Sequence, residues 1–272
     1  CFAGILAAPS VEWMRVLDNV HWTVSYATAA ALAWMSTRHA ATLEERAPRR
    51  MFALGLSSYT IGQILWDIQV YIGWNPFPGP SDFFYLLLGI FFFCGLYVTL
   101  RHGRAAQVRA ALLDAAALSA VVIAAALAVY LPRRGETGLL PLAVMVAYPS
   151  LMLSAVSLGV ILIPTMRLRP SPAWIVLLLS ATVNGGLWLE WNARTLDNSL
   201  ADGTLLNAAF SVAAIFMGIG ALLWKPSFSS NPVYERWSEG FLRFLPMFLV
   251  VAVTVAAALA STLPGHNEHV QI

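Results

Sequence analysis

Residues 110–131 read AALLDAAALSAVVIAAALAVYL, and this stretch decides the fold class. It contains one charged residue, Asp114, and Pro132 follows it. An α-helix needs about 20 mainly apolar residues to cross the hydrocarbon core of a bilayer. The run is also unbroken, whereas a strand of a membrane barrel alternates apolar and polar residues. The stretch therefore predicts a transmembrane helix.

Seven further stretches of the same character lie on either side of it, joined by short connections. Most connections contain proline, glycine or charge, among them Ala47-Pro48 and residues 75–82. We predict an all-α, polytopic transmembrane bundle of about eight helices, with residues 1–272 forming a single transmembrane domain. The predicted spans are 18–37, 51–74, 83–101, 110–131, 139–166, 172–192, 204–224 and 240–263.

The charged residues are few, and their placement predicts an orientation. They make up 11% of the chain, against about 25% in soluble domains, so the lipid bilayer is the expected partner. Of the sixteen Arg and Lys residues, twelve lie in or beside the first, third, fifth and seventh connections. The positive-inside rule places that side in the cytoplasm and residues 75–82 outside. This distribution accounts for the net charge of +2 without a nucleic-acid partner.

The second and sixth spans resemble each other. Trp66 and Trp188 occupy similar positions, and the outer loops that follow carry Asp82 and Asp202. Both spans run in the same direction, so the similarity predicts a parallel repeat of four helices plus four, with halves 10–135 and 136–265. Such a repeat has a pseudo-two-fold axis along the membrane normal. The alternative is a chance similarity between membrane helices.

Polar and aromatic residues concentrate in the outer halves of these two spans. Ionisable groups inside a bilayer are costly unless they are paired or hydrated. One interpretation is a cavity that opens outward and binds a small molecule between aromatic walls. The other is an aromatic belt at the membrane interface whose carboxylates reach headgroup water. The candidate ligand-binding residues are Gln63, Trp66, Asp67, Tyr71, Asp82, Asn184, Trp188 and Glu190.

Motifs for catalysis or cofactor binding are missing from the sequence. It contains no phosphate loop, no Gly-x-Ser-x-Gly, no His-Glu-x-x-His and no Cys-x-x-Cys. We therefore expect no catalytic residues, no cofactor and no metal site in this chain. His21 is expected at a solvated helix start, with Asp18 or Asn19 as the N-cap. Pro149, inside the fifth span, is expected to kink its helix and to serve as a hinge in signal relay.

The ends of the sequence predict a fragment of a longer chain. The first residue is Cys1 rather than methionine, and Gly265–Ile272 forms a polar ending after the last span. On the predicted orientation this ending lies outside, so a cytoplasmic domain would need a further helix before it.

Residues 74–87, WNPFPGPSDFFYLL, resemble a pattern in known membrane proteins. Multi-pass sensory domains N-terminal to bacterial GGDEF/EAL (diguanylate cyclase/phosphodiesterase) signalling proteins have an acidic residue near a helix end. A proline-rich turn follows it and leads into the next helix. Tyr148-Pro149 is similar to the start of that family's fifth helix, although Ser150 stands where an acidic residue is usual. The matching positions are Asp67, Pro78, Pro80, Ser81, Asp82, Tyr85 and Leu86.

The resemblance implies a sensory or regulatory transmembrane domain of the bacterial inner membrane. Such a domain would detect an outer or intramembrane signal and relay it to a cytoplasmic output module outside this chain, for cyclic-di-GMP turnover or kinase activity. A small-molecule ligand and a homodimer are expected by the same analogy. Two other functions stay open: a small-solute transporter, favoured by the parallel repeat and the membrane carboxylates, and a structural subunit of a membrane complex.

Overall fold

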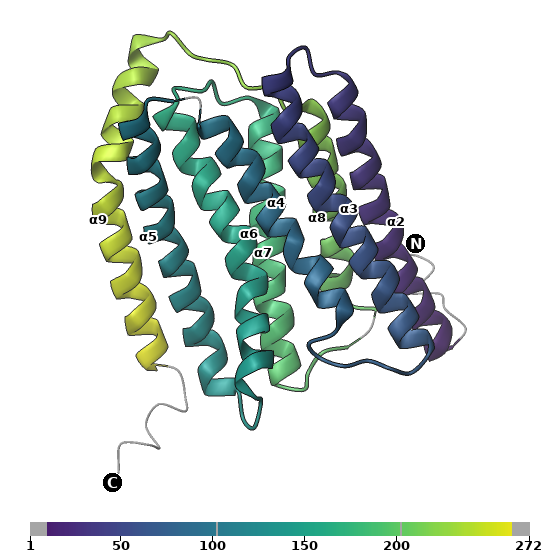
Figure 1. Ribbon diagram of the computed structural model, residues 1–272. Helices are drawn as coiled ribbons and strands as arrows, with labels where there is room; N and C mark the ends of the chain where they lie inside the picture. Colours follow the sequence, from purple (N-terminus) through teal and green to yellow (C-terminus); the bar gives the residue numbers. More distant parts are fainter. Residues whose placement is uncertain (1–9, 102, 202, 263–272) are drawn as a thin grey trace.

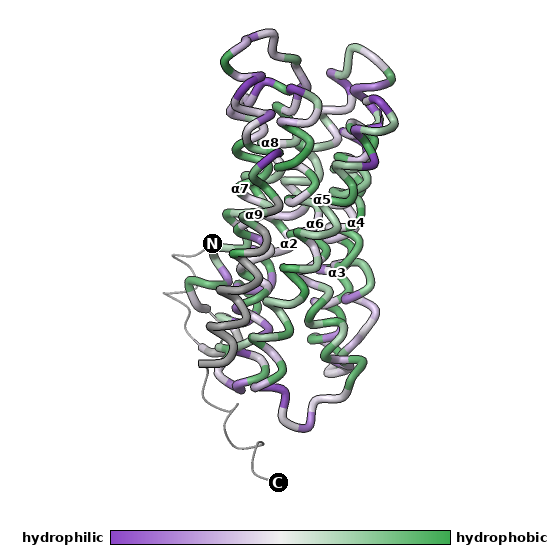
Figure 2. The backbone as a smooth tube through the Cα atoms, turned by 90° about the vertical axis from the view of Figure 1, so that its left-hand side faces the viewer, coloured by the Kyte–Doolittle hydropathy of each residue, from purple (hydrophilic) through white to green (hydrophobic). Residues whose placement is uncertain are grey.

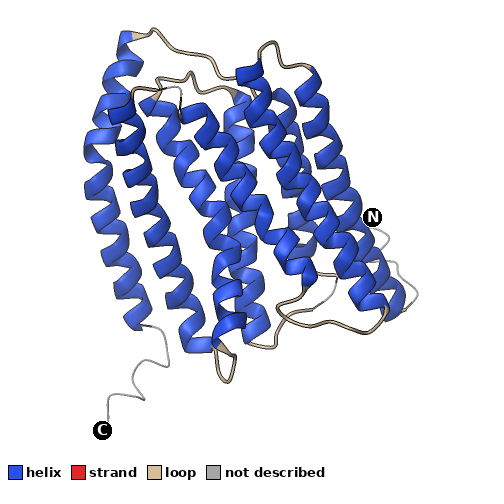
Figure 3. Cartoon of the chain, viewed as in Figure 1, coloured by secondary structure: helices blue, strands red, loops and turns tan. Residues whose placement is uncertain are grey.

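The computed structural model describes residues 10–101, 103–201 and 203–262. Over these residues the chain is all-helical and has no strand, as Figure 3 shows, so the predicted all-α bundle is confirmed. The elements are α2 (Val11–Arg38), α3 (Leu43–Tyr71), α4 (Pro80–Leu100), α5 (Ala105–Tyr130), the 3-10 turn η1 (Leu131–Arg133), α6 (Leu139–Thr165), α7 (Pro172–Leu196), α8 (Leu205–Leu223) and α9 (Pro232–Thr262).

Three helices begin well ahead of their predicted spans. The Ser10 hydroxyl accepts a hydrogen bond from the backbone N–H three residues on, at 3.3 Å, and thereby caps α2. Thr42 caps α3 in the same way, at 3.1 Å. The prediction of Asp18 or Asn19 as N-cap is therefore wrong, and Pro48 lies inside α3 rather than in a connection. The helix α9 begins at Pro232, eight residues before its predicted start.

The described helices have the make-up of a multi-pass membrane protein. Five of them, α4 to α8, are long and apolar enough to cross a bilayer. Figure 2 shows hydrophobic residues along the middle of the bundle and hydrophilic residues gathered at its two ends. Exposed side chains of the helix surfaces include Ile61, Leu113 and Leu179. Such side chains suit lipid, since water would penalise apolar surface of this extent.

Six helices form a closed ring. Neighbours pack in the order α2, α3, α4, α6, α7 and α8, and α8 packs back on α2. The chain reverses direction at each connection, so α4 and α6 run parallel to each other, as do α8 and α2 (Figure 1). We call these two parallel interfaces the α4–α6 seam and the α8–α2 seam, and they lie on opposite sides of the ring. The helix α5 packs outside, on α6, and α9 packs on α5 and α6.

The helix contacts repeat for the first three helices of each predicted half of the chain, but not for the fourth. The pairs among α2, α3 and α4 recur among α6, α7 and α8, and the two seams correspond to each other. The last helices differ, because α9 packs on α5 and α6 instead of on α2. Asp202 lies outside the described residues, but Asn207 is the third residue of α8 as Asp82 is of α4. The internal repeat thus stays a prediction.

A glycine brings the two helices of each seam close together. A methyl group on Gly89 would lie 2.7 Å from the backbone carbon of Leu151 in the α4–α6 seam. On Gly218 it would lie 2.6 Å from the Cα of Ala29 in the α8–α2 seam. Small residues allow membrane helices to approach this closely and to gain van der Waals contact. The seams therefore depend on the absence of a side chain at these two positions.

The end of α6 is joined to the start of α9 by an arrangement that we call the far-end clasp. The backbone N–H of Arg169 donates to the Ser227 carbonyl at 2.7 Å, and the N–H of Ser229 donates to the Arg167 carbonyl at 2.8 Å. The Arg167 guanidinium contacts Glu235 at 2.9 Å. These contacts link the connection after α6 with the connection before α9, at the end of the bundle drawn uppermost in Figure 1.

Candidate ligand-binding site

A cavity of about 310 Å³ lies within the ring, close to the end of the bundle opposite the far-end clasp. All six ring helices contribute side chains to it, together with the connections after α3 and α7. Two carboxylates, four tryptophans and two tyrosines line it, and no arginine or lysine does among the described residues. The lining residues are Asp18, Asn19, Trp22, Gln63, Trp66, Asn75, Phe77, Asp82, Tyr85, Met145, Tyr148, Trp188, Trp191, Asn192, Thr195, Leu200 and Asn207.

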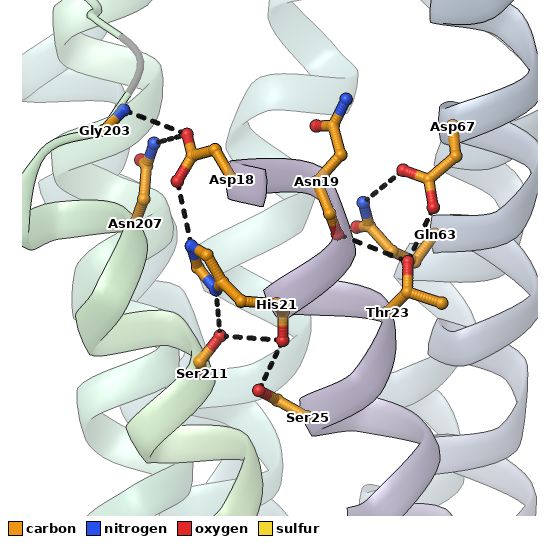
Figure 4. A network of polar contacts seen from close by, with 10 residues as sticks. All are labelled: Asp18, Asn19, His21, Thr23, Ser25, Gln63, Asp67, Gly203, Asn207 and Ser211. Carbon is orange, nitrogen blue, oxygen red and sulfur yellow. Dashed lines mark hydrogen bonds and ion pairs between the residues drawn. The ribbon is translucent and has the colours of Figure 1, made fainter. Parts of the chain in front are cut away.

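Asp18 sits at the α8–α2 seam and is fixed by three donors. Its Oδ1 accepts from His21 Nε2 at 2.8 Å, and its Oδ2 accepts from the backbone N–H of Gly203 at 3.1 Å and from Asn207 Nδ2 (Figure 4). His21 contacts Ser211 Oγ at 2.6 Å through its other ring nitrogen. The expected solvated position of His21 is therefore wrong: its side chain is buried, because α2 begins ten residues earlier.

Asp82 sits at the α4–α6 seam, on the opposite side of the ring, and is fixed in a similar way. Its Oδ1 accepts from the Tyr148 hydroxyl, and its Oδ2 accepts from the backbone N–H of Gly79 at 2.6 Å. Asp82 therefore both caps α4 and joins it to α6. The two seams thus present one buried carboxylate each, held by hydrogen bonds from the neighbouring parallel helix.

Asp67 lies behind the cavity wall rather than in it. Its Oδ1 accepts from Gln63 Nε2 at 3.1 Å and its Oδ2 from Thr23 Oγ1 at 2.6 Å, as Figure 4 shows. Gln63 in turn accepts from the Tyr85 hydroxyl at 2.8 Å. A buried amide with its partners satisfied keeps a single orientation. Asp67 therefore fixes how Gln63 faces the cavity.

Aromatic rings that contact one another form the other walls. Tyr148 stacks on Trp188 with ring centroids 4.0 Å apart. Trp22 makes an edge contact with Trp191 at 5.5 Å. Trp66 lines the cavity from α3, which lies across the ring from α7 and Trp188. Rings that pack on one another lose little further entropy when a ligand binds, so these walls are preorganised.

The structure brings together four of the predicted ligand-binding residues. Gln63, Trp66, Asp82 and Trp188 all line the cavity. Asn184 lies in the buried core of the ring, fully shielded, where its Nδ2 donates to the Tyr26 hydroxyl at 2.8 Å. It lies next to the cavity-lining residues Tyr85, Tyr148 and Trp188 around a void of about 10 Å³, which has room for about one water molecule.

Besides Asp67 and Asn184, two more predicted residues do not line the cavity, and both lie on the outside of the bundle. Tyr71 is 91% exposed. Residues four apart on a helix differ in direction by about 40°, and Tyr71 is two such steps from Gln63. Because Gln63 faces the cavity, Tyr71 is turned away from it. Glu190 is two residues from Trp188 and so points to the other side of α7. There its carboxylate pairs with Arg194 at 2.7 Å on an exposed surface, a contact worth about 0–1 kcal/mol.

Several lining residues are not among the ligand-binding residues that the sequence predicts. Asp18 and Asn19 are predicted only as helix caps, and Tyr85 and Tyr148 carry only the family resemblance. Asn207 is a further one, a buried amide in the otherwise mostly apolar α8. An isolated amide in an apolar helix can be recognised in the sequence as a sign of a buried polar contact, because a membrane helix buries such a group only with a partner.

Pro149 does not interrupt α6, which is helical from Leu139 to Thr165. A proline cannot donate to the carbonyl four residues earlier, here that of Met145. Asn192 supplies the missing donor from α7, with its Nδ2 2.9 Å from the Met145 oxygen. The proline thus ties α6 to α7 beside the cavity, and its expected role as a hinge stays a prediction.

Replacing Asn192 with alanine should lower stability by about 1–3 kcal/mol, because the Met145 carbonyl would be buried without a donor. In a Pro149→Ala background the new backbone N–H can bond that carbonyl, so the same replacement should cost less than half as much. The measurement is a double-mutant cycle by thermal unfolding in detergent. Equal costs in both backgrounds would show that Asn192 does not compensate for the proline.

No family model, no curated protein and no solved structure matches this chain. Among the described residues, no group of three or more His, Cys, Asp or Glu side chains is placed to hold a metal ion.

Proposed function

We propose that this chain is a sensory domain that binds a small molecule in the membrane and transmits the binding event along its helices. The cavity carries this proposal, because its walls come from all six ring helices. A ligand there contacts every helix of the ring at once, so it can favour one arrangement of those helices over another. The cavity volume of about 310 Å³ is at the small end of the range for ligand pockets, about 300–1,000 Å³.

The helix α6 provides a route from the cavity to the opposite end. Tyr148 of α6 hydrogen-bonds Asp82 and stacks on Trp188, so it responds to any ligand that displaces either one. At its other end α6 runs into the far-end clasp, where Arg167 contacts Glu235 of α9. A shift of α6 would therefore move the start of α9, at the end of the bundle opposite the cavity.

The residues that carry the family resemblance support the same function. Asp82 and Tyr85 lie far from Tyr148 in the sequence, and all three line the cavity. We propose that the cavity end faces the outside of a bacterial inner membrane and that the far-end clasp lies at the cytoplasmic side, from which the signal would pass to an output for cyclic-di-GMP turnover or kinase activity. A homodimer is the arrangement expected by analogy with signalling proteins.

The test is hydrogen exchange on the chain in lipid nanodiscs, with and without a library of small neutral, cationic and anionic metabolites. A ligand that binds should slow exchange at the cavity and also change it in residues 166–171 and 224–231, at the far end. Arg167→Gln, which removes the contacts with Glu235 and Glu239, should leave the cavity effect and reduce the far-end effect. If no compound alters exchange at both ends, the sensory proposal is wrong.

Flux measurements separate this function from transport. The purified chain in liposomes should bind its ligand without carrying it across the membrane. Accumulation of the bound compound inside the liposomes would favour the transporter instead.

A further inference from the structure

We propose that the cavity selects a small organic ammonium ion, held between its two carboxylates and its tryptophans. This ligand class rests on the proposed function, because it assigns a chemistry to the same cavity. Three features of the described residues support it: the sign of the charge, the aromatic walls and a buried acceptor without a donor.

The charge in the cavity wall is negative. Asp18 and Asp82 are the charged residues that line it, and they face it from opposite seams. A third carboxylate, Asp67, lies directly behind Gln63. His21, which contacts Asp18 at 2.8 Å, carries at most one positive charge, so the sum over the three carboxylates and His21 is negative. Two nearby cations are engaged elsewhere: Arg133 pairs with Asp197 at 3.2 Å and Arg194 with Glu190 at 2.7 Å. In a site of low dielectric, this imbalance favours a cation and excludes an anion.

The aromatic walls favour an organic cation over a metal ion. Tryptophan faces attract ammonium groups more strongly than the faces of tyrosine or phenylalanine do, and four tryptophans line this cavity. A metal ion instead needs several oxygen ligands converging at about 2.0–2.6 Å. Asp18 and Asp82 belong to opposite seams, and their oxygens are already engaged by donors of the protein. The two carboxylates therefore create a negative electrostatic potential in the cavity and do not form the coordination shell of a metal ion.

An acceptor in the wall lacks a donor. Asn207 is 2% exposed and lines the cavity, and its Nδ2 donates to Asp18. Its Oδ1 has no hydrogen-bond partner among the described residues. A buried amide oxygen without a donor is costly, and a ligand N–H that reached it from the cavity would satisfy it. This feature favours a protonated primary or secondary amine over a quaternary ammonium ion.

Matched probes can test the charge preference on the full chain in nanodiscs, with empty nanodiscs as the blank. Phenethylamine, 2-phenylethanol and phenylacetate have eight carbons and one ring each and differ chiefly in charge at neutral pH. We expect calorimetric titration to show binding in that order, with the amine at least about tenfold tighter than the alcohol. Methylation of the amine to the quaternary trimethylammonium ion should weaken its binding.

For each variant, the affinities for the amine and for the alcohol are measured on the same protein. A smaller folded fraction affects both affinities equally and leaves their ratio unchanged. Asp82→Asn should reduce the preference for the amine at least threefold. Asp197→Asn is the matched control, because it removes an exposed carboxylate at the same end that does not line the cavity. Trp66→Leu should also reduce the preference for the amine. This variant changes a half-buried residue, so it provides a second test if Asp82→Asn does not fold.

The outcomes distinguish the ligand class from the sensory function. Tighter binding of phenylacetate or phenylethanol, no binding of the amine, or a preference unchanged in both Asp82→Asn and Trp66→Leu would overturn the ammonium proposal. The sensory function would survive those results if a neutral or anionic metabolite altered hydrogen exchange at both ends. Amine binding without a far-end change would support the ligand class and contradict the sensory function.

Discussion

Replacing Gly89 or Gly218 with alanine is expected to destabilise the bundle by about 1–3 kcal/mol each, because the added methyl group meets backbone atoms of the opposing helix. At Gly89 the nearest are those of Leu151 and Met152, at 2.7–2.8 Å, and at Gly218 the nearest is the Cα of Ala29, at 2.6 Å. Backbone atoms in a packed helix cannot move aside as a flexible side chain can. The seams must therefore widen, which should also separate Asp82 from Tyr148 and Asp18 from Asn207.

Thermal unfolding in detergent measures the loss of stability, and Gly186→Ala is the matched control. Gly186 is also in the middle of a helix, but nothing beyond its chain neighbours and the local helix backbone lies within 4 Å of an added methyl group. Alanine is the better helix former, so this variant should be neutral or more stable by up to about 1 kcal/mol. If all three alanine variants behaved alike, the close approach at the seams would not be what stabilises the ring.

Replacing Trp188 with alanine is expected to have the largest effect of any single change at the cavity, about 3–5 kcal/mol. Trp188 is 8% exposed, and its indole stacks on Tyr148 and makes edge contacts with Trp22 and Phe210. Its removal takes away these contacts and enlarges the cavity, and the surrounding helices can collapse only partly. The aromatic wall of α7 would be lost, so ligand binding should fail even where the protein stays folded.

Trp13→Ala is the control for this prediction. Trp13 is in α2 at the same end of the bundle, and 57% of it is exposed. Its loss should change unfolding by less than about 0.5 kcal/mol, as is usual for surface positions. A Trp188 variant that unfolded like the Trp13 variant would mean that Trp188 does not support the cavity.

The sequence by itself determined the fold class and the end of the bundle at which polar residues gather. Long apolar runs such as residues 110–131 can satisfy their backbone hydrogen bonds in lipid only as helices, so helix number and order follow from the runs and their connections. Trp66 and Trp188 were also recognisable as candidates, because polar and aromatic residues beside them interrupt otherwise apolar helices.

Only the tertiary structure decided which of these residues face one another. Glu190 and Trp188 are two residues apart, yet one pairs with Arg194 on the surface and the other stacks on Tyr148 in the cavity. Asp18 and Asn207 meet because α8 packs back on α2, a contact that no local pattern encodes. The physical reason is that hydropathy specifies how much of a helix avoids water. It does not specify which neighbour covers each face, since in lipid that choice depends on shape and hydrogen bonds between distant segments.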